Sequence, residues 1–171
     1  MASKLEPLFS SKNEHWNTPE DVLSAIYGFC GGPVGLDPCS NETSIVKSDR
    51  AFTIDDDGLS LSWDCDGLVF VNPPYGRGIG AWISKCEDSY FFDGSEVIAL
   101  VPARTDPKWF QDYAPRMTAI LFWAGRLRFL GGKSSAPFPS MLLYWGDRPN
   151  RFRFAFRSLG LCAEPLPVGG S

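Results

Sequence analysis

Four residues that could do chemistry, Asn72, Pro73, Pro74 and Tyr75, directly follow the apolar run 68–71. The run is typical of a buried parallel strand, and the prolines end it because they fix φ and lack an N–H donor. Asn72 and Tyr75 are therefore expected at the carboxyl end of a strand, where open α/β sheets bind ligands. A rigid strand-to-helix turn would also explain two prolines, but the amide and the aromatic ring beside them favour a binding site.

A second polar side chain ends a strand in the same way. The short apolar stretch 34–36 runs into Asp37 and Pro38, and small residues follow them. An Asp-Pro pair is also a common structural turn, so this stretch alone leaves both interpretations open. Together with the first motif, it predicts two polar groups at the same edge of a sheet.

The elements that must position these residues alternate between strands and helices. Apolar runs predict further strands at 96–102, 118–123 and 141–145. Thr18 suits an N-cap with Pro19 at the first helical position, and 76–80 leads into another helix. The glycines of that stretch fall at Gly-x-Gly-x-Gly, which is not the dinucleotide-binding spacing. Alternating strands and helices predict an α/β fold with a doubly wound sheet.

Length and composition indicate one globular domain. The chain has 171 residues, of which 44% are hydrophobic and 21% are charged. We expect a flexible N-terminus over 1–13, a single domain over 14–160 and a flexible tail over 161–171. No stretch predicts a membrane span or a signal peptide, so no membrane partner is expected. The five cysteines form no Cys-x-x-Cys pair, which argues against a zinc site or disulfide framework and favours a reducing cytoplasm.

Charge is distributed unevenly along the chain. Residues 1–100 hold 6 Lys/Arg and 16 Asp/Glu, a balance of −10, and residues 101–171 hold 10 and 4, a balance of +6. The two sum to the net charge of −4. The stretches 126–130 and 151–157 alternate basic and apolar residues, which predicts strands with one charged face. Such strands can bind a nucleic-acid backbone, although a guarded edge strand explains 151–157 equally well.

Six stretches in the same order resemble one protein family. They are 16–19, 36–39, 56–59, 72–78, 102–106 and 135–140. Together they resemble the small phage- and prophage-encoded DNA adenine-N6 methyltransferases, often called Dam-like, of which some serve restriction-modification. The motif 72–75 alone is shared with methyltransferases that act on other planar amino groups, whereas the six stretches span most of the chain.

The resemblance implies a fold and an activity. The fold would be Rossmann-like, as in methyltransferases that use S-adenosylmethionine (SAM), with a mostly parallel sheet and a C-terminal antiparallel hairpin. The enzyme would transfer a methyl group from SAM to N6 of adenine in double-stranded DNA, by base flipping, without an obligatory protein partner. The alternatives are cytosine N4, an RNA base or a protein glutamine as acceptor, or an inactive DNA-binding relative.

The resemblance also implies roles for particular residues. Asn72, Pro73, Pro74 and Tyr75 would be catalytic, with Tyr75 stacking on the flipped base. Cofactor contacts would come from Trp16, Thr18, Asp37, Pro38 and one of Asp55, Asp56 and Asp57. A calcium loop is not expected there, because its Asp-x-Asp-x-Asp-Gly spacing is absent. Predicted DNA contacts are Arg77, Arg104, Lys108, Arg126, Arg128, Lys133 and Phe138.

Overall fold

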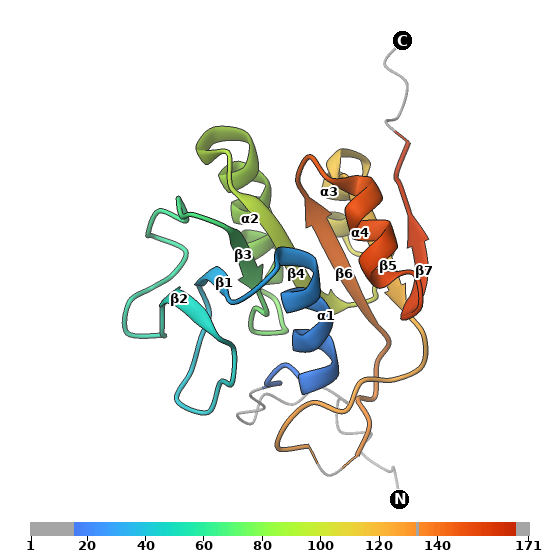
Figure 1. The fold of residues 1–171 in the computed structure, drawn as a ribbon, viewed down its shortest axis with the longest axis horizontal. Helices are drawn as coiled ribbons and strands as arrows, with labels where there is room; N and C mark the ends of the chain where they lie inside the picture. The colour runs from blue at the N-terminus through green and yellow to red at the C-terminus, as the bar shows by residue number, and fades with distance from the viewer. Residues whose placement is uncertain (1–15, 133, 167–171) are drawn as a thin grey trace, which may run out of the picture.

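Seven strands form one sheet in the order β2-β1-β3-β4-β6-β5-β7 (Figure 1). The computed structural model describes residues 16–132 and 134–166, so the expected flexible N-terminus, Lys133 and 167–171 lie outside the described residues. The strands are β1 (Val34–Asp37), β2 (Ser48–Ala51), β3 (Leu68–Val71), β4 (Glu96–Pro102), β5 (Ala119–Trp123), β6 (Ser140–Trp145) and β7 (Gly160–Ala163).

The direction of the strands changes in the middle of the sheet. β2, β1, β3 and β4 pair in parallel, whereas β4–β6, β6–β5 and β5–β7 are antiparallel pairs. The sheet is therefore parallel only in its first part, and the expected antiparallel hairpin is a three-strand region whose β5–β6 connection spans 124–139. The predicted α/β class is confirmed.

Helices cover both faces of the sheet. They are α1 (Glu20–Cys30), α2 (Ile79–Asp93), α3 (Lys108–Tyr113) and α4 (Pro149–Phe156), with a 3-10 turn at Ala114–Arg116. Along β3, Leu68 and Phe70 pack with α1 and α4, and Val69 and Val71 pack with α2 and α3. Figure 1 shows α1 and α4 on the near face and α2 and α3 behind the sheet. None of the described helices is both long and apolar enough to span a membrane.

The chain reverses its direction of progress across the sheet between β1 and β3. From β1 it moves outward to β2, then returns to β3 on the other side of β1 and continues to β4. Ligands of open α/β sheets bind outside the carboxyl ends of strands at such a switch point. The carboxyl ends of β1 and β3 carry Asp37 and Asn72, so topology brings the two predicted motifs together.

Two sequence-based expectations for helices and strands are wrong. Helix α1 begins at Glu20 with Pro19 at the N-cap and no side-chain cap, so Thr18 does not cap it. The segment expected as an alternating strand over 151–157 is helix α4, preceded by Pro149 at its first position. Phe152 and Phe156 are four residues apart and share the buried face, which fits a helix as well as alternation fits a strand.

The basic stretch 126–130 and the end of the chain also differ from expectation in their secondary structure. Residues 126–130 form no strand beyond an isolated bridge from Leu130 to Asn17, yet Arg126 and Arg128 are exposed and Leu127 and Phe129 are buried, as the alternation predicts. At the other end, β7 extends the sheet beyond residue 160, where we expected the domain to end.

Candidate active site

One cavity joins the carboxyl ends of β1 and β3. Its volume is about 260 Å³, and it opens beside the segment that precedes α1. Seven of the residues predicted as catalytic or cofactor-binding line it: Trp16, Thr18, Asp37, Asn72, Pro73, Pro74 and Tyr75. They are separated by up to 59 positions in the sequence, so the fold itself assembles this group.

The side chain of Asn72 is held by the segment before α1. Its Nδ2 atom donates to the carbonyl oxygen of Trp16 at 2.6 Å and to Oγ1 of Thr18 at 3.0 Å. A backbone carbonyl can only accept, so the nitrogen of the amide must face Trp16. The oxygen Oδ1 is thereby left as an acceptor, and the hydroxyl of Tyr75 donates to it at 2.9 Å.

The ring of Tyr75 belongs to an aromatic cluster that we define as Trp16, Tyr75, Phe129 and Phe138. Trp16 and Tyr75 each pack edge-on against both phenylalanines, with centroids 5.3–6.1 Å apart. Burial raises the pKa of the Tyr75 phenol well above its ordinary value, so its hydroxyl stays protonated as a donor. Phe138, predicted to contact DNA, is only 7% exposed and packs within this cluster.

Asp37 is a buried carboxyl group at the end of β1, where it lines the cavity. It is 3% exposed, and its Oδ1 accepts the N–H of Cys39 at 3.2 Å. Burial raises its pKa to about 6, because hydrogen bonds from Cys39, Ser40 and Ser44 only partly offset the loss of water. A cationic group in the cavity would favour the ionised form of this carboxyl.

The three acids after β2 lie in an exposed turn and do not line the cavity. Gly58 allows this turn to lie close against the loop after β1, because any larger residue would place its Cβ 2.0 Å from the carbonyl oxygen of Pro38. Asp56 closes its own turn, accepting from the backbone N–H and hydroxyl of Thr53. The residue of this turn that does line the cavity is Ile54, which is 93% exposed.

The loop that follows Asp37 is fastened by side chains. Asn41 Nδ2 donates to Asn17 Oδ1 at 2.7 Å, and Asn17 Nδ2 donates to Thr43 Oγ1 at 2.6 Å. Sequence reasoning did not foresee this network. It also missed six residues that line the cavity: Asn17, Cys39, Asn41, Ser44, Val46 and Ile54. The only sequence signal was their proximity to the predicted motifs.

The sequence of the chain matches a known protein family over most of its length. The chain matches the model of the family described as DNA N-6-adenine-methyltransferase (Dam) over residues 7–149. The chain belongs to the Dam family. It is a DNA adenine methyltransferase that transfers a methyl group to the N6 amino group of adenine. Among curated proteins, no significantly similar sequence is found.

Five basic residues predicted to contact DNA follow the strands β3, β4 and β5. Arg77 follows β3, Arg104 and Lys108 follow β4, and Arg126 and Arg128 lie on the β5–β6 connection. All five are exposed, although Lys108 also pairs with Asp112. In Figure 1 this connection (orange) lies at the same end of the sheet as the start of α1. Two backbone hydrogen bonds, Leu130 to Asn17 and Ala103 to Pro139, fix it there.

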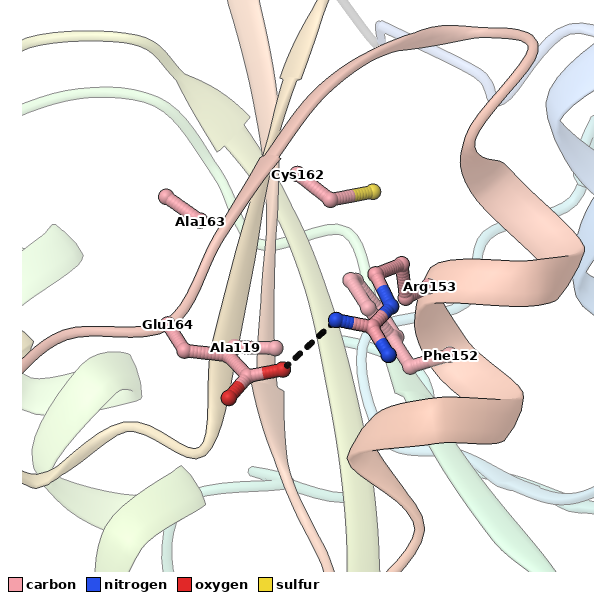
Figure 2. A pocket seen from close by; sticks show the side chains of 6 residues that line it. All are labelled: Ala119, Phe152, Arg153, Cys162, Ala163 and Glu164. Carbon is pink, nitrogen blue, oxygen red and sulfur yellow. Dashed lines mark ion pairs between the residues drawn. The ribbon is translucent and has the colours of Figure 1, made fainter.

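A second hollow of this Dam-family protein, about 250 Å³, lies between α4 and β7 (Figure 2). Its lining residues are Ala119, Phe152, Arg153, Cys162, Ala163 and Glu164. Arg153 and Glu164 face each other at 3.9 Å, and both are more than half exposed. This hollow is at the amino end of β5, the edge of the sheet opposite to Asn72, and contains none of the predicted site residues. The cavity at Asn72 is therefore the candidate active site.

The buried carboxyl of Asp37 makes a testable contribution to stability. Its folded-state pKa of about 6 exceeds the ordinary 3.8. The protonated carboxyl of Asp37 therefore contributes its full stabilisation below about pH 4, and this contribution is lost as the pH rises through about 6. Asp37→Asn should remove this pH dependence and stabilise the free protein at pH 7.5 by up to about 3 kcal/mol. Urea unfolding between pH 4 and 8 measures it. Asp64→Asn, at an exposed aspartate, is the matched control. If the free energy of unfolding of Asp37→Asn depends on pH in the same way as that of the wild type, the raised pKa of Asp37 is contradicted.

Proposed function

We propose that this Dam-family enzyme uses SAM as methyl donor and double-stranded DNA as substrate, on a Rossmann-like methyltransferase fold. The observation that carries the proposal is the single cavity shared by the catalytic amide of Asn72 and the buried carboxyl of Asp37. It provides an acceptor for the amino group of a base at one end and a site for a cationic cofactor at the other. We further propose action in a bacterial cytoplasm, since the five cysteines are free thiols. We also propose that the enzyme needs no obligatory protein partner.

The residues of the cavity fit SAM in charge and polarity. Asp37 would hold the cationic methionine part, since its carboxyl is buried and gains most from a positive neighbour. Ile54 and Val46 would supply an apolar wall for the adenosine ring. None of the three acids after β2 lines the cavity, so a contact to the ribose hydroxyls would have to come from Asp55 or Asp57 at its rim, since Asp56 closes its own turn. When bound, SAM supplies an electrophilic methyl group attached to a positively charged sulfur.

Asn72 would activate the amino group of adenine by accepting its protons. The lone pair of that nitrogen is delocalised into the ring, which makes it a poor nucleophile. Hydrogen bonds from its two protons to Asn72 Oδ1 and to the Pro73 carbonyl would favour a tetrahedral nitrogen and return the lone pair to it. Acceptors fixed in advance stabilise the transition state without reorganising. The orientation of Asn72, set by Trp16 and Thr18, provides such an acceptor.

A base within a duplex cannot reach this cavity, so the adenine must be flipped out of the stack, at a cost of a few kcal/mol. Tyr75 lines the cavity, and we propose that its ring stacks on the flipped base. Stacking on an aromatic ring contributes about 1–3 kcal/mol per base, which offsets much of that cost. Phe138 and Phe129 would support the ring of Tyr75 through the edge-on contacts of the aromatic cluster.

The exposed arginines of the β5–β6 connection should contact phosphates. Arg126→Gln and Arg128→Gln are each expected to weaken binding to duplex DNA and to lower the slope of log K against log salt by about 1. Fluorescence anisotropy at several salt concentrations measures this slope. Arg157→Gln, at the exposed end of α4, is the control and should leave it unchanged. An unaltered slope in both test variants would remove these residues from the DNA-binding face.

The proposed donor and substrate can be tested in one assay. Purified protein is incubated with methyl-tritiated SAM and equal amounts of duplex DNA, single-stranded DNA, RNA or an acceptor protein. The label should enter duplex DNA, and digestion to nucleosides should place it in N6-methyladenine. Preferred labelling of RNA, protein or single-stranded DNA would contradict the proposed substrate, and a lack of SAM binding in calorimetry would contradict the proposed donor.

A further inference from the structure

Asn72 is held in place by residues that lie far from it in the sequence. Both N–H groups of its amide are engaged, one by the carbonyl oxygen of Trp16 and one by the hydroxyl oxygen of Thr18, 54 positions away. The carbonyl of Trp16 belongs to the backbone, so Thr18 is the side chain through which this part of the sequence acts on the amide.

Thr18 is placed for this contact and not for helix capping. It is 3% exposed, it lines the cavity, and α1 begins two residues later without a side-chain cap. Asn72 Nδ2 approaches Thr18 Oγ1 at 3.0 Å, a normal hydrogen-bond length. If the hydroxyl is removed, one N–H of Asn72 loses its partner inside the protein. Asn72 is partly buried, and leaving this donor unsatisfied costs free energy, so the amide would then move away from its present orientation.

We propose that Thr18 is a positioning residue, which fixes the amide of Asn72 so that Oδ1 is presented as the acceptor for the N6 amino group. This inference rests on the proposed role of Asn72. It differs from the family expectation, in which Thr18 contacts the cofactor. The two roles predict different kinetics, because a positioning residue affects the rate at saturating cofactor, whereas a cofactor contact affects the cofactor concentration needed for saturation.

Three substitutions at position 18 separate the hydroxyl from the rest of the side chain. Thr18→Val keeps the shape without the hydroxyl, Thr18→Ala removes both, and Thr18→Ser keeps the hydroxyl. With saturating SAM and duplex DNA, single-turnover methylation should be at least about tenfold slower in Thr18→Val and Thr18→Ala, the rate equivalent of one buried hydrogen bond. Thr18→Ser should stay within about threefold of the wild type. If the valine variant does not fold, the alanine and serine variants decide the question.

The matched control is Thr118→Val. The hydroxyl of Thr118 donates to the carbonyl oxygen of Gly146 at 2.8 Å, at the opposite edge of the sheet from the cavity. The same hydroxyl accepts the N–H of Gly146 at 3.2 Å. This variant therefore loses threonine hydrogen bonds outside the cavity, and its single-turnover rate should equal that of the wild type below its melting temperature. A slow Thr18→Val beside a normal Thr118→Val assigns the effect to Asn72 and not to a general loss of stability.

An NMR measurement tests the orientation without activity. The side-chain amide cross-peaks of Asn72 are assigned by their absence in Asn72→Ala. They should shift in Thr18→Val and keep their positions in Thr18→Ser. The inference is overturned if Thr18→Val reaches the wild-type rate at saturating SAM, or if Thr18→Ser is as slow as Thr18→Val. The proposed role of Asn72 fails by a different result, undiminished methylation by Asn72→Ala, and the proposed function fails if duplex DNA is not the labelled substrate, so the failures are distinguishable.

Discussion

Asn72→Ala should lower methyl transfer to DNA by about a hundredfold to a thousandfold, the usual loss when one preorganised hydrogen-bonding group is removed from a transition state. The amide is oriented by Trp16 and Thr18, so its oxygen is already in place before a base arrives. Alanine provides no acceptor, and the lone pair of the amino group would stay delocalised. Single-turnover methylation of duplex DNA with excess enzyme measures this loss directly.

The expected loss is confined to the chemical step. Calorimetry should show that Asn72→Ala still binds SAM, because Asp37 and the apolar wall at Ile54 are untouched. Asn150→Ala is the matched control, at an exposed asparagine on α4 whose side-chain oxygen accepts from Arg153 at 2.8 Å. Undiminished turnover in Asn72→Ala would refute the role given to this amide.

Tyr75→Ala should reduce kcat/KM for duplex DNA by about tenfold to a hundredfold, because it removes the ring that we propose stacks on the flipped base. Tyr75→Phe should cost far less. The phenylalanine ring keeps the edge-on contacts with Phe129 and Phe138 and loses only the hydroxyl that donates to Asn72. The oxygen of Asn72 has two lone pairs, so it can accept from a base whether or not the hydroxyl is present.

Base flipping itself can be followed in these two variants. A duplex carrying 2-aminopurine at the target position gains fluorescence when that base leaves the stack, and Tyr75→Ala should reduce the gain more than Tyr75→Phe. Tyr90→Ala serves as the control, since Tyr90 lies on α2 and its hydroxyl donates to Asp147, outside the cavity. If Tyr75→Phe and Tyr75→Ala lose activity equally, the hydroxyl and not the ring is the important group.

Much of the site could be predicted because it depends on where strands end. The apolar runs before Asp37 and Asn72 are buried strands, and parallel strands that neighbour each other deliver their carboxyl ends to one edge. Local sequence is sufficient for this inference, since a run of buried residues closed by a proline and a polar group has few other interpretations.

The parts that sequence reasoning missed depend on side-chain contacts between distant segments. Nothing near Thr18 indicates that its hydroxyl faces Asn72, since a Thr-Pro pair before a helix reads equally well as a cap. In the segment 151–157, alternate Arg and Phe residues satisfy a period of two, while the pair Phe152 and Phe156 also satisfies one helical turn. Packing against α1 and the sheet, which the local pattern does not contain, settles that choice.

The buried carboxyl of Asp37 links the lifetime of this protein to its ligand. At neutral pH the free protein carries a charge that burial disfavours, and a cationic ligand in the cavity would relieve it. A ligand that binds only the folded state adds RT ln(1 + [L]/Kd) to its stability, about 2.7 kcal/mol at a concentration one hundred times Kd. A change of this size alters the fraction of unfolded chains, and hence the steady-state abundance that proteases allow, severalfold. In a cell depleted of methyl donor, the steady-state abundance of the enzyme would therefore fall together with its activity.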